Sequence, residues 1–323
     1  MAAAPTNTFT SIAAVGNRED LSDIIYNVDP IDCPVVASIE RASATAVLHE
    51  WQNDGYAAAA RDNAQPEGED ASTDAATATS RLSNTCQIMD KVARVSGTQR
   101  AVNSAGRSDE LEYQVYKKTM ELRRDIEGTV LGHVAEVTGD TTTARKFGTL
   151  GTWLTSNLSE ASDATTSTGG GNNARTDGTN RALTEGMLKE VLRECWNNGG
   201  DPECIVVGSF NKQVISGFTG NATRMKTAED KKLMAAIDLY DSDFGELQII
   251  PDRFCRPILG GSDTTGDLWV IQKDMLALAT LRPVGIESLA KTGDSDRRQI
   301  LTEFTLEVRN QKACGAVFDL SIS

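Results

Sequence analysis

The chain contains two histidines, and one of them begins a motif that could bind zinc. His49 is followed by Glu50, which is how the HExxH motif of zinc proteases starts. Asn53 stands where that motif has its second histidine, so no pair of imidazoles lies one helical turn apart to bind a metal. We therefore interpret His49 as a strand residue. His133 has no cysteine or aspartate at a spacing typical of a catalytic triad, and we expect a packing role for it on a long helix.

Three further motifs are similar to parts of enzymes. Gly208-Ser209-Phe210 lies between a predicted strand and a predicted helix but lacks the GxSxG spacing of a nucleophile elbow, so we interpret Ser209 as a helix cap. Gly169–Gly171 has no following GK[ST], which indicates a flexible loop rather than a phosphate site. In Lys291-Thr292-Gly293-Asp294, Ala290 replaces the aspartate that ion-pumping ATPases phosphorylate. We therefore expect no catalytic residue and no cofactor.

Other candidate metal ligands are acidic residues and cysteines. Asp241, Asp243 and Glu246 cluster at a predicted hairpin turn, where an incidental divalent ion is the alternative to a solvated turn. The remainder of a calcium-binding loop is missing, so we expect no metal site. The cysteines form no CxxC pair, and we expect reduced, mostly buried thiols at Cys33, Cys86, Cys195, Cys204, Cys255 and Cys314.

Composition excludes several classes of function. With 32 Lys and Arg against 46 Asp and Glu, the formal charge is -14, which repels phosphate and argues against sequence-specific nucleic-acid binding. The 323 residues are 39% hydrophobic, so we expect a modest core that is completed by burial against partners. The amino terminus lacks a signal-peptide pattern, and no stretch approaches membrane-spanning length.

The strongest predicted element is a helix over residues 108–137, capped by Ser108 and about 45 Å long at 1.5 Å per residue. Gly128 and Gly132 in this helix are expected to admit a crossing strand. The following elements predict a mixed α/β unit: a helix over residues 183–196, capped by Thr184, a buried strand at 204–207 and a second helix from Ser209. Apolar stripes and alternation predict further strands at 237–240, 247–250, 268–272, 300–308 and 316–322. The apolar stripe of the long helix consists of Leu111, Val115, Leu122, Ile126, Val130 and Val137.

Polar segments surround these elements. Residues 1–45 read as an arm, with a short helix over 18–28 and an extended stretch over 29–34. Predicted strands at 46–51 and 82–95 flank a polar stretch, which is either an extended hairpin arm or a disordered surface loop. Residues 139–180 form a second low-complexity region.

In order, these pieces resemble the Hong Kong 97-like fold of tailed-phage capsid subunits, and more specifically the major capsid family typified by phage SU-ten. The resemblance covers nearly the whole chain. It rests on Asp20-Leu21-Ser22-Asp23, Asp29-Pro30, Cys33-Pro34, Glu50-Trp51, Glu67-Gly68, Asn84, Gln87, Val95-Ser96-Gly97-Thr98-Gln99, Tyr240, Phe244-Gly245 and Leu289-Ala290-Lys291-Thr292-Gly293-Asp294.

The resemblance implies an α+β subunit with four parts. These are an N-terminal arm (1–45), an E-loop (46–97), a peripheral domain with the spine helix (98–182 and 271–323) and an axial domain (183–270). It also implies that hexamers and pentamers form an icosahedral phage head, assembled in the host cytoplasm, around double-stranded DNA. A polar E-loop can be ordered when it lies across a neighbouring subunit. The implied inter-subunit contacts of the E-loop are Trp51, Asp54, Tyr56, Arg61, Glu67 and Arg81.

The implied partners are a portal, a separate scaffold protein and decoration proteins, with no membrane. Some relatives cross-link their shells through an E-loop lysine, but no lysine precedes Lys91 here, so we expect no such bond. Two alternatives remain at this point: the shell of a cellular nanocompartment, which would need a groove for cargo peptides, and a soluble α/β enzyme with a deep polar pocket.

Overall fold

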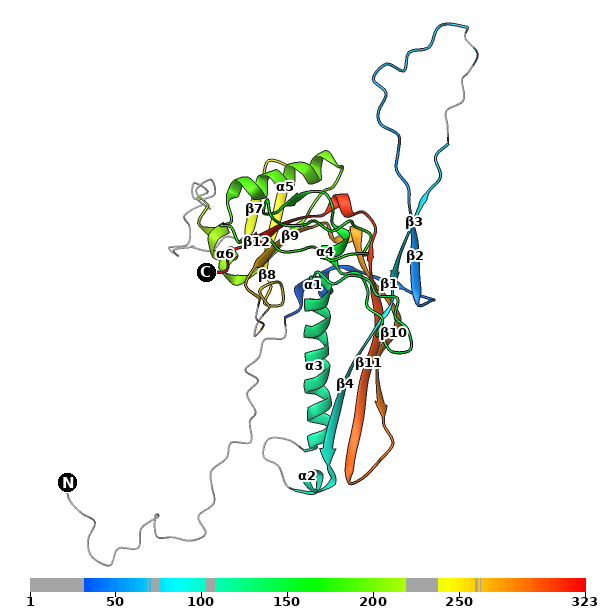
Figure 1. Ribbon diagram of the computed structural model, residues 1–323, viewed down its shortest axis with the longest axis vertical. Coiled ribbons are helices and arrows are strands. Elements are labelled where there is room, and N and C mark those ends of the chain that lie inside the picture. The colour runs from blue at the N-terminus through cyan, green and yellow to red at the C-terminus, as the bar shows by residue number, and fades with distance from the viewer. Residues whose placement is uncertain are drawn as a thin grey trace, which may run out of the picture.

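The computed structural model describes residues 32–68, 70, 76–102, 108–218, 238–258, 261 and 263–323. Figure 1 shows a long helix, α3 (Glu110–Val130), beside long strands in one lobe, and a second lobe of mixed helices and strands at one end of this helix. A hairpin with a long loop projects away from both lobes. The helix predicted over 18–28 lies outside the described residues.

The first lobe packs α3 on a four-stranded sheet with the strand order β1-β10-β11-β4. Its buried residues include Leu111, Val115, Leu122, Ile126 and Val130, which confirms most of the predicted stripe. Val137 lies beyond the helix. The strands are β1 (Glu40–Ser43), β10 (Leu276–Ser288), β11 (Ser295–Val308) and β4 (Gln87–Ser96), and the short helix α2 (Gly97–Ala101) follows β4.

The spine helix is shorter than predicted, and both of its ends have a physical cause. Asp109, rather than Ser108, is the N-cap, because its Oδ1 accepts the N–H of Leu111 at 2.9 Å. At the other end, the Thr149 hydroxyl donates to the carbonyl of Gly132 at 2.6 Å and accepts the N–H of Val134 at 2.9 Å. These groups are no longer available to continue the helix, so α3 spans 21 residues, about 32 Å, instead of 108–137.

The second lobe is a six-stranded sheet with the order β5-β12-β9-β6-β8-β7. Helix α5 (Glu185–Asn197) begins at the predicted cap Thr184, whose side chain accepts the N–H of Met187. Helix α6 (Ser209–Ser216) corrects one prediction: Gly208 is the N-cap and Ser209 is the first helical residue. The strands are β5 (Leu158–Ser159), β12 (Gly315–Leu320), β9 (Gly266–Ile271), β6 (Cys204–Val207), β8 (Gly245–Pro251) and β7 (Leu239–Ser242).

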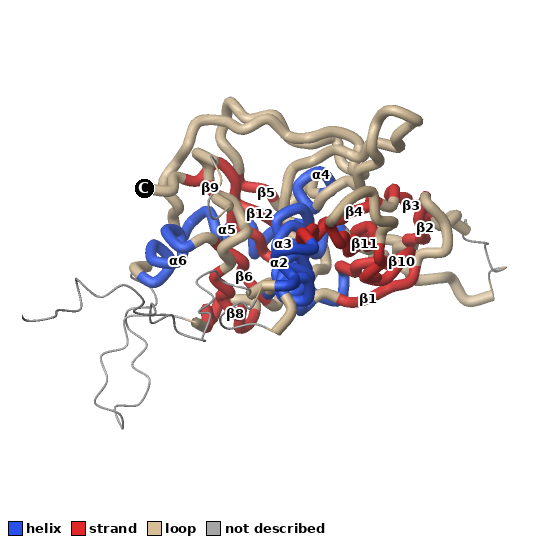
Figure 2. Tube along the Cα trace, turned by 90° about the horizontal axis from the view of Figure 1, so that it is seen from below, coloured by secondary structure: helices blue, strands red, loops and turns tan. Residues whose placement is uncertain are grey.

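The end of the chain joins the two lobes. Strand β11 belongs to the first sheet, whereas β12 pairs with β9 in the second, although the sequence groups both in the segment 271–323. Figure 2 shows α3 near the centre, with β4, β10 and β11 on one side and β6, β8 and β12 on the other. Figure 1 shows that the first sheet runs alongside α3, whereas the second lies beyond one end of this helix.

The segment 32–43 also packs on the first lobe. Pro34 begins a short helix, α1 (Pro34–Ser38), so the predicted extended backbone ends before it, and residues 29–31 lie outside the described part. Val35 is buried, and β1 pairs in parallel with β10. This part of the predicted arm is thus a component of the lobe around the spine helix.

The low-complexity segment 139–180 contains one short helix, α4 (Leu150–Trp153), and strand β5. The glycines 169–171 all have positive φ, and a Cβ added to Gly148 would lie 2.6 Å from the Cα of Gly171. Two backbone segments approach closely here, so these glycines have a packing role beyond that of the predicted loop. Nearby, buried Arg175 pairs with Asp319 of β12 at 2.7 Å.

Other predictions about single residues have mixed outcomes. All six cysteines are free and buried, as expected. His133 lies after α3 rather than on it, where its Nε2 is 2.8 Å from Asp267 Oδ2 and its ring stacks on Trp269. Gly128 admits no crossing strand among the described residues; its neighbours are Phe254 and Ile258 of a loop.

Candidate functional site

The projecting hairpin consists of β2 (Leu48–Asn53) and β3 (Ser80–Thr85), paired from Leu48 opposite Thr85 to Asn53 opposite Ser80. The side chains of β2 alternate between exposed and half-buried, and the half-buried positions are 49, 51 and 53. Alternation is expected of a strand with one face on a support. The predicted strand 82–95 is interrupted at Cys86, because β3 pairs with β2 whereas β4 pairs with β11.

Three side chains attach β2 to the end of β11. His49 Nε2 lies 3.0 Å from Glu307 Oε2, and Trp51 Nε1 donates to the Val308 carbonyl at 3.1 Å. The Asn53 amide donates to the Arg309 carbonyl. We call these three residues, His49, Trp51 and Asn53, the root clamp. Because they follow one another at every second position, they hold β2 along its length.

The partner of His49 in the root clamp is the carboxyl group of Glu307. Burial opposes the ionisation of Glu307, but hydrogen bonds from His49 and Arg309 outweigh it, so the pKa of this carboxyl lies below its usual range. The Arg309 Nε donates to the second carboxylate oxygen at 3.0 Å. The carboxylate is therefore ionised at neutral pH and fixed from two sides.

Strand β3 is fixed by Asn84, which is fully buried. Its amide nitrogen donates to the carbonyls of Gly148 at 3.0 Å and Leu306 at 2.8 Å, and its oxygen accepts the Gly148 N–H at 2.8 Å. One amide thus connects three segments that are distant in the chain. Asn84 is one of the residues on which the family resemblance rests, but no local sequence pattern indicates its anchoring role.

Beyond the root, the described residues of the loop lie outside the core. Every described residue between Asp54 and Thr79 is exposed, and Tyr56 is 106% exposed relative to its reference state. The ring of Tyr56 thus packs against no part of its own subunit. Asp54 accepts the N–H of Gly55 at 2.9 Å and shapes the start of the loop.

The six predicted contact residues fall into two groups. Trp51 lies at the root, half-buried and 5.4 Å from the Trp153 ring, so part of its surface packs on its own subunit. Arg81 is exposed on β3 and lies 3.4 Å from Glu50. The remaining four lie in the exposed loop, namely Asp54, Tyr56, Arg61 and Glu67. Sequence reasoning missed His49 and Asn53 as anchors, although the period-two spacing 49, 51, 53 was a usable signal.

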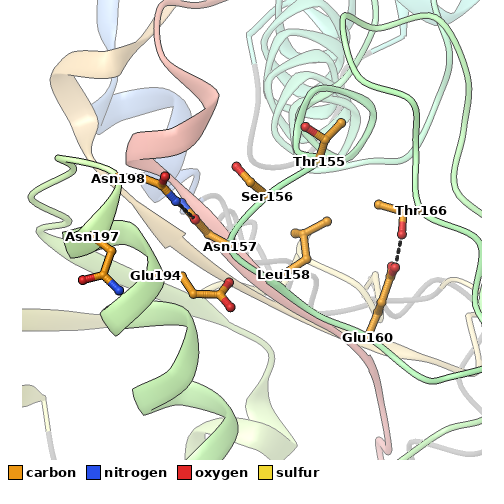
Figure 3. Close-up of a pocket in the computed structure, with 9 residues that line it drawn as sticks. All are labelled: Thr155, Ser156, Asn157, Leu158, Glu160, Thr166, Glu194, Asn197 and Asn198. Carbon is orange, nitrogen blue, oxygen red and sulfur yellow. Dashed lines mark hydrogen bonds between the residues drawn. The ribbon is translucent and has the colours of Figure 1, made fainter. Parts of the chain in front are cut away.

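A polar pocket of about 510 Å³ lies between α5 and the segment before β5, and Figure 3 shows its lining. The Asn198 amide donates to Asn157 Oδ1 at 2.7 Å, and Thr166 hydrogen-bonds Glu160. The Ser156 hydroxyl donates to Gln311 Oε1 at 3.1 Å, and no histidine, lysine or cysteine is among the described residues that line the pocket. The Ser156 hydroxyl is thus bonded to Gln311, and the ionisable side chains that line the pocket are the carboxylates of Glu160 and Glu194.

Metal sites and membrane-spanning helices are two further features to consider. Within the described ranges, no three His, Cys, Asp or Glu side chains are grouped as a metal site would require, the acidic turn between β7 and β8 included. In the same part of the chain, no helix has the length and hydropathy needed to cross a bilayer.

Comparisons with known proteins agree with this architecture. The major capsid protein of Escherichia phage Phieco32 is 25% identical over an alignment of 347 positions, which covers 96% of each chain. The capsid subunit of Cyanophage A-1(L) has a TM-score of 0.63 at 12% identity over 96% of this chain and 98% of that one. The encapsulin SrpI of Synechococcus elongatus has a TM-score of 0.56 at 10% identity over 98% and 97%. These two structural likenesses concern the fold, and they confirm the predicted Hong Kong 97-like fold.

Because a phage capsid and an encapsulin share this fold, the fold alone does not separate a phage head from a cellular compartment. The sequence match does. The model of the SU10 major capsid protein family matches residues 4–321, nearly the full length of the sequence. The chain therefore belongs to the SU10 major capsid protein family.

Proposed function

We propose that this major capsid protein assembles as hexamers and pentamers into an icosahedral head around double-stranded DNA, in the cytoplasm of the host. The net charge of -14 supports a container that confines DNA without binding its sequence. The role is structural and requires no catalysis or cofactor. A portal, a scaffold protein and decoration proteins complete the proposed set of partners.

The observation that carries the proposal is the contrast within the hairpin: a loop whose described residues lie outside the core, on a firmly attached root. A solitary subunit gains nothing from holding such a loop outward, whereas a neighbouring subunit can satisfy its backbone and side chains. The proposed inter-subunit contacts are Trp51, Asp54, Tyr56, Arg61, Glu67 and Arg81. Trp51 also packs on the root through its half-buried ring.

The proposed division of the subunit follows the arm, E-loop, peripheral and axial segments at 1–45, 46–97, 98–182 with 271–323, and 183–270. We assign β12 to the axial part, because it pairs with β9. The α1 and β1 segments act with the peripheral part, because β1 pairs with β10.

Replacing residues 54–79 with Asn-Gly tests the proposal, because this dipeptide closes a two-residue hairpin between Asn53 and Ser80, which are paired in β2 and β3. We expect a folded, soluble subunit that forms no closed shells in electron micrographs. Normal shells from this variant would contradict the proposed role of the loop.

A control variant keeps the length, composition and charge of the loop but carries residues 56–79 in scrambled order. If this control also fails to close shells, specific contacts are required. If it closes them, the length of the loop is sufficient.

A further inference from the structure

Two acidic side chains are buried together where α1, α3 and the end of β8 meet. Glu127 of α3 is 0% exposed, and Asp252, which follows β8, is 3% exposed. Acidic residues are almost never fully buried unless they have partners. The partners of this pair therefore show what the pair does.

Glu127 holds the start of α1. Its Oε1 accepts the N–H of Val35 at 2.6 Å, and its Oε2 accepts the N–H of Val36 at 2.8 Å. These N–H groups belong to the first turn of α1, where no helical carbonyl can satisfy them. One carboxyl group of the spine helix thus fixes the segment that precedes β1.

Asp252 approaches Glu127 from the other side. Its Oδ1 accepts the N–H of Phe254 at 2.8 Å, whereas its Oδ2 is buried with no hydrogen-bond donor among the described residues. The side chains of Asp252 and Glu127 are nevertheless within hydrogen-bonding reach of one another. Two carboxylates cannot donate to each other, so a proton on one of them is the donor that this oxygen lacks.

The charged groups around the pair come from all three elements. Cys33, the N-cap of α1, lies close enough to Glu127 for the carboxyl charge to act on its thiol, and Arg123 and Arg124 of α3 also act on this thiol. The Arg124 guanidinium stacks over the Phe254 ring at 5.2 Å. From the segment after β8, Cys255 lies near Asp252, and Arg253 donates its backbone N–H to Asp252.

Burial is the main electrostatic effect on the pair. The pKa of Glu127 is raised to about 7, mainly by burial and in smaller part by the charge of Asp252, while the N–H bonds of Val35 and Val36 oppose the rise. Burial likewise raises the pKa of Asp252. Both directions favour the protonated form of a carboxyl in this pair.

We propose that Glu127 and Asp252 share one proton, and that this proton fastens the segment 33–38 to the spine helix so that the attachment weakens as pH rises. We call this pair the carboxyl latch. It concerns the folded subunit by itself and does not depend on the proposed assembly.

The direction of the pH effect follows from linkage. The closed latch keeps its proton up to about pH 7, whereas an exposed glutamate loses it near 4.5. The shared proton therefore stabilises the closed segment fully below pH 4.5. Between pH 4.5 and about pH 7 the equilibrium constant for closing falls by up to about tenfold per pH unit, and above about pH 7 this stabilisation is lost.

Hydrogen exchange of the full chain, followed by mass spectrometry from pH 5 to pH 8, tests the latch. After correction for the pH dependence of intrinsic exchange, we expect the protection of the Val35 and Val36 amides to fall as pH rises. The amides of Ile205 and Val207 in β6 serve as the internal reference and should keep their protection. A flat profile at Val35 and Val36 in the natural chain would overturn the proposal.

The decisive variant is Asp252→Asn, because its amide can donate to Glu127 permanently while its oxygen still accepts the Phe254 N–H. We expect the protection of Val35 and Val36 in this variant to lose its decline with pH. Asp201→Asn, the same charge change at an exposed site before β6, should keep the natural profile. An unaltered decline in Asp252→Asn would contradict the shared proton.

A spectroscopic measurement covers the case in which Asp252→Asn does not fold. Infrared difference spectra of the natural chain between pH 5.5 and pH 8 should contain the carbonyl band of a buried carboxylic acid that disappears as pH rises. Asp201→Asn should retain this band. Its absence from the natural chain would refute the latch without reference to any variant of the pair.

Discussion

The root of the hairpin and the loop that it carries are continuous in the chain but differ in their physical surroundings. The root residues 48–53 and 80–85 contact β11 and the segment around Gly148 through one buried amide and three clamp side chains. The described residues of the loop contact little but water. We therefore expect the stability of the subunit to depend on the root, and the proposed contacts with a neighbour to depend on the loop. Substitutions in the two regions should separate these properties.

The largest expected loss of stability comes from Asn84→Ala. The change removes three hydrogen bonds and leaves the Gly148 N–H and the Leu306 carbonyl without these partners in a buried place, which costs about 3 kcal/mol. Urea unfolding of the unassembled subunit measures this loss. Ser83→Ala, at the neighbouring and half-buried position of β3, is the control and should change little.

Trp51→Ala should destabilise the subunit by about 2 kcal/mol. This is less than the loss expected when a fully buried tryptophan is truncated, because the Trp51 ring is half-exposed. The variant loses ring packing against Trp153 and the hydrogen bond to Val308. Trp51→Phe keeps most of the packing and should recover about half of the loss. If both variants unfold like the natural chain, the root clamp does not stabilise β2.

Glu307→Gln should cost about 1 kcal/mol at pH 7, because it weakens charge-assisted hydrogen bonds to His49 and Arg309. Since the pKa of Glu307 is lowered on folding, its contribution is present above its ordinary pKa of 4.5 and is lost as pH falls through the lowered value. The free energy of unfolding, measured with urea at pH 7 and at pH 3, should therefore differ less between the two pH values for this variant than for the natural chain. Glu287→Gln, at an exposed position of β10, is the control.

The smallest effect on stability is expected at the loop, where Tyr56→Ala and Arg61→Ala should leave urea unfolding unchanged. Both should reduce the yield of closed shells, which light scattering during assembly and micrographs can measure. A shell yield equal to that of the natural chain would assign the loop contacts to other residues. A loss of stability would instead mean that the loop packs on its own subunit.

The sequence predicted those elements whose signals are local. The stripe from Leu111 to Val130, the cap Thr184 and the hairpin of β7 and β8 follow from spacing and turn residues within a few positions. The alternation over 300–308 likewise predicted most of β11.

The features that the sequence did not predict depend on distant partners. The break at Cys86 exists because β3 and β4 pair with different strands, and the end of α3 depends on Thr149. Strand β10 was not predicted, because its register against β11 shifts near Arg282 and the alternation of apolar and polar residues is interrupted there. Of the candidate site, the sequence identified the exposed loop residues but not their support, since the partners of the clamp lie more than 250 residues away.

The root clamp also has a mechanical consequence. The side chains of His49, Trp51 and Asn53 bond to residues at the end of β11 from alternate positions of β2, the strand that leads into the loop. A pull on the loop by a neighbour therefore loads these bonds in shear, so that they share the force instead of breaking one after another. Because the chain passes from β11 into β12, the tension spreads into both lobes. In the proposed shell, we expect the loop to work as a strap that transmits load between neighbouring subunits.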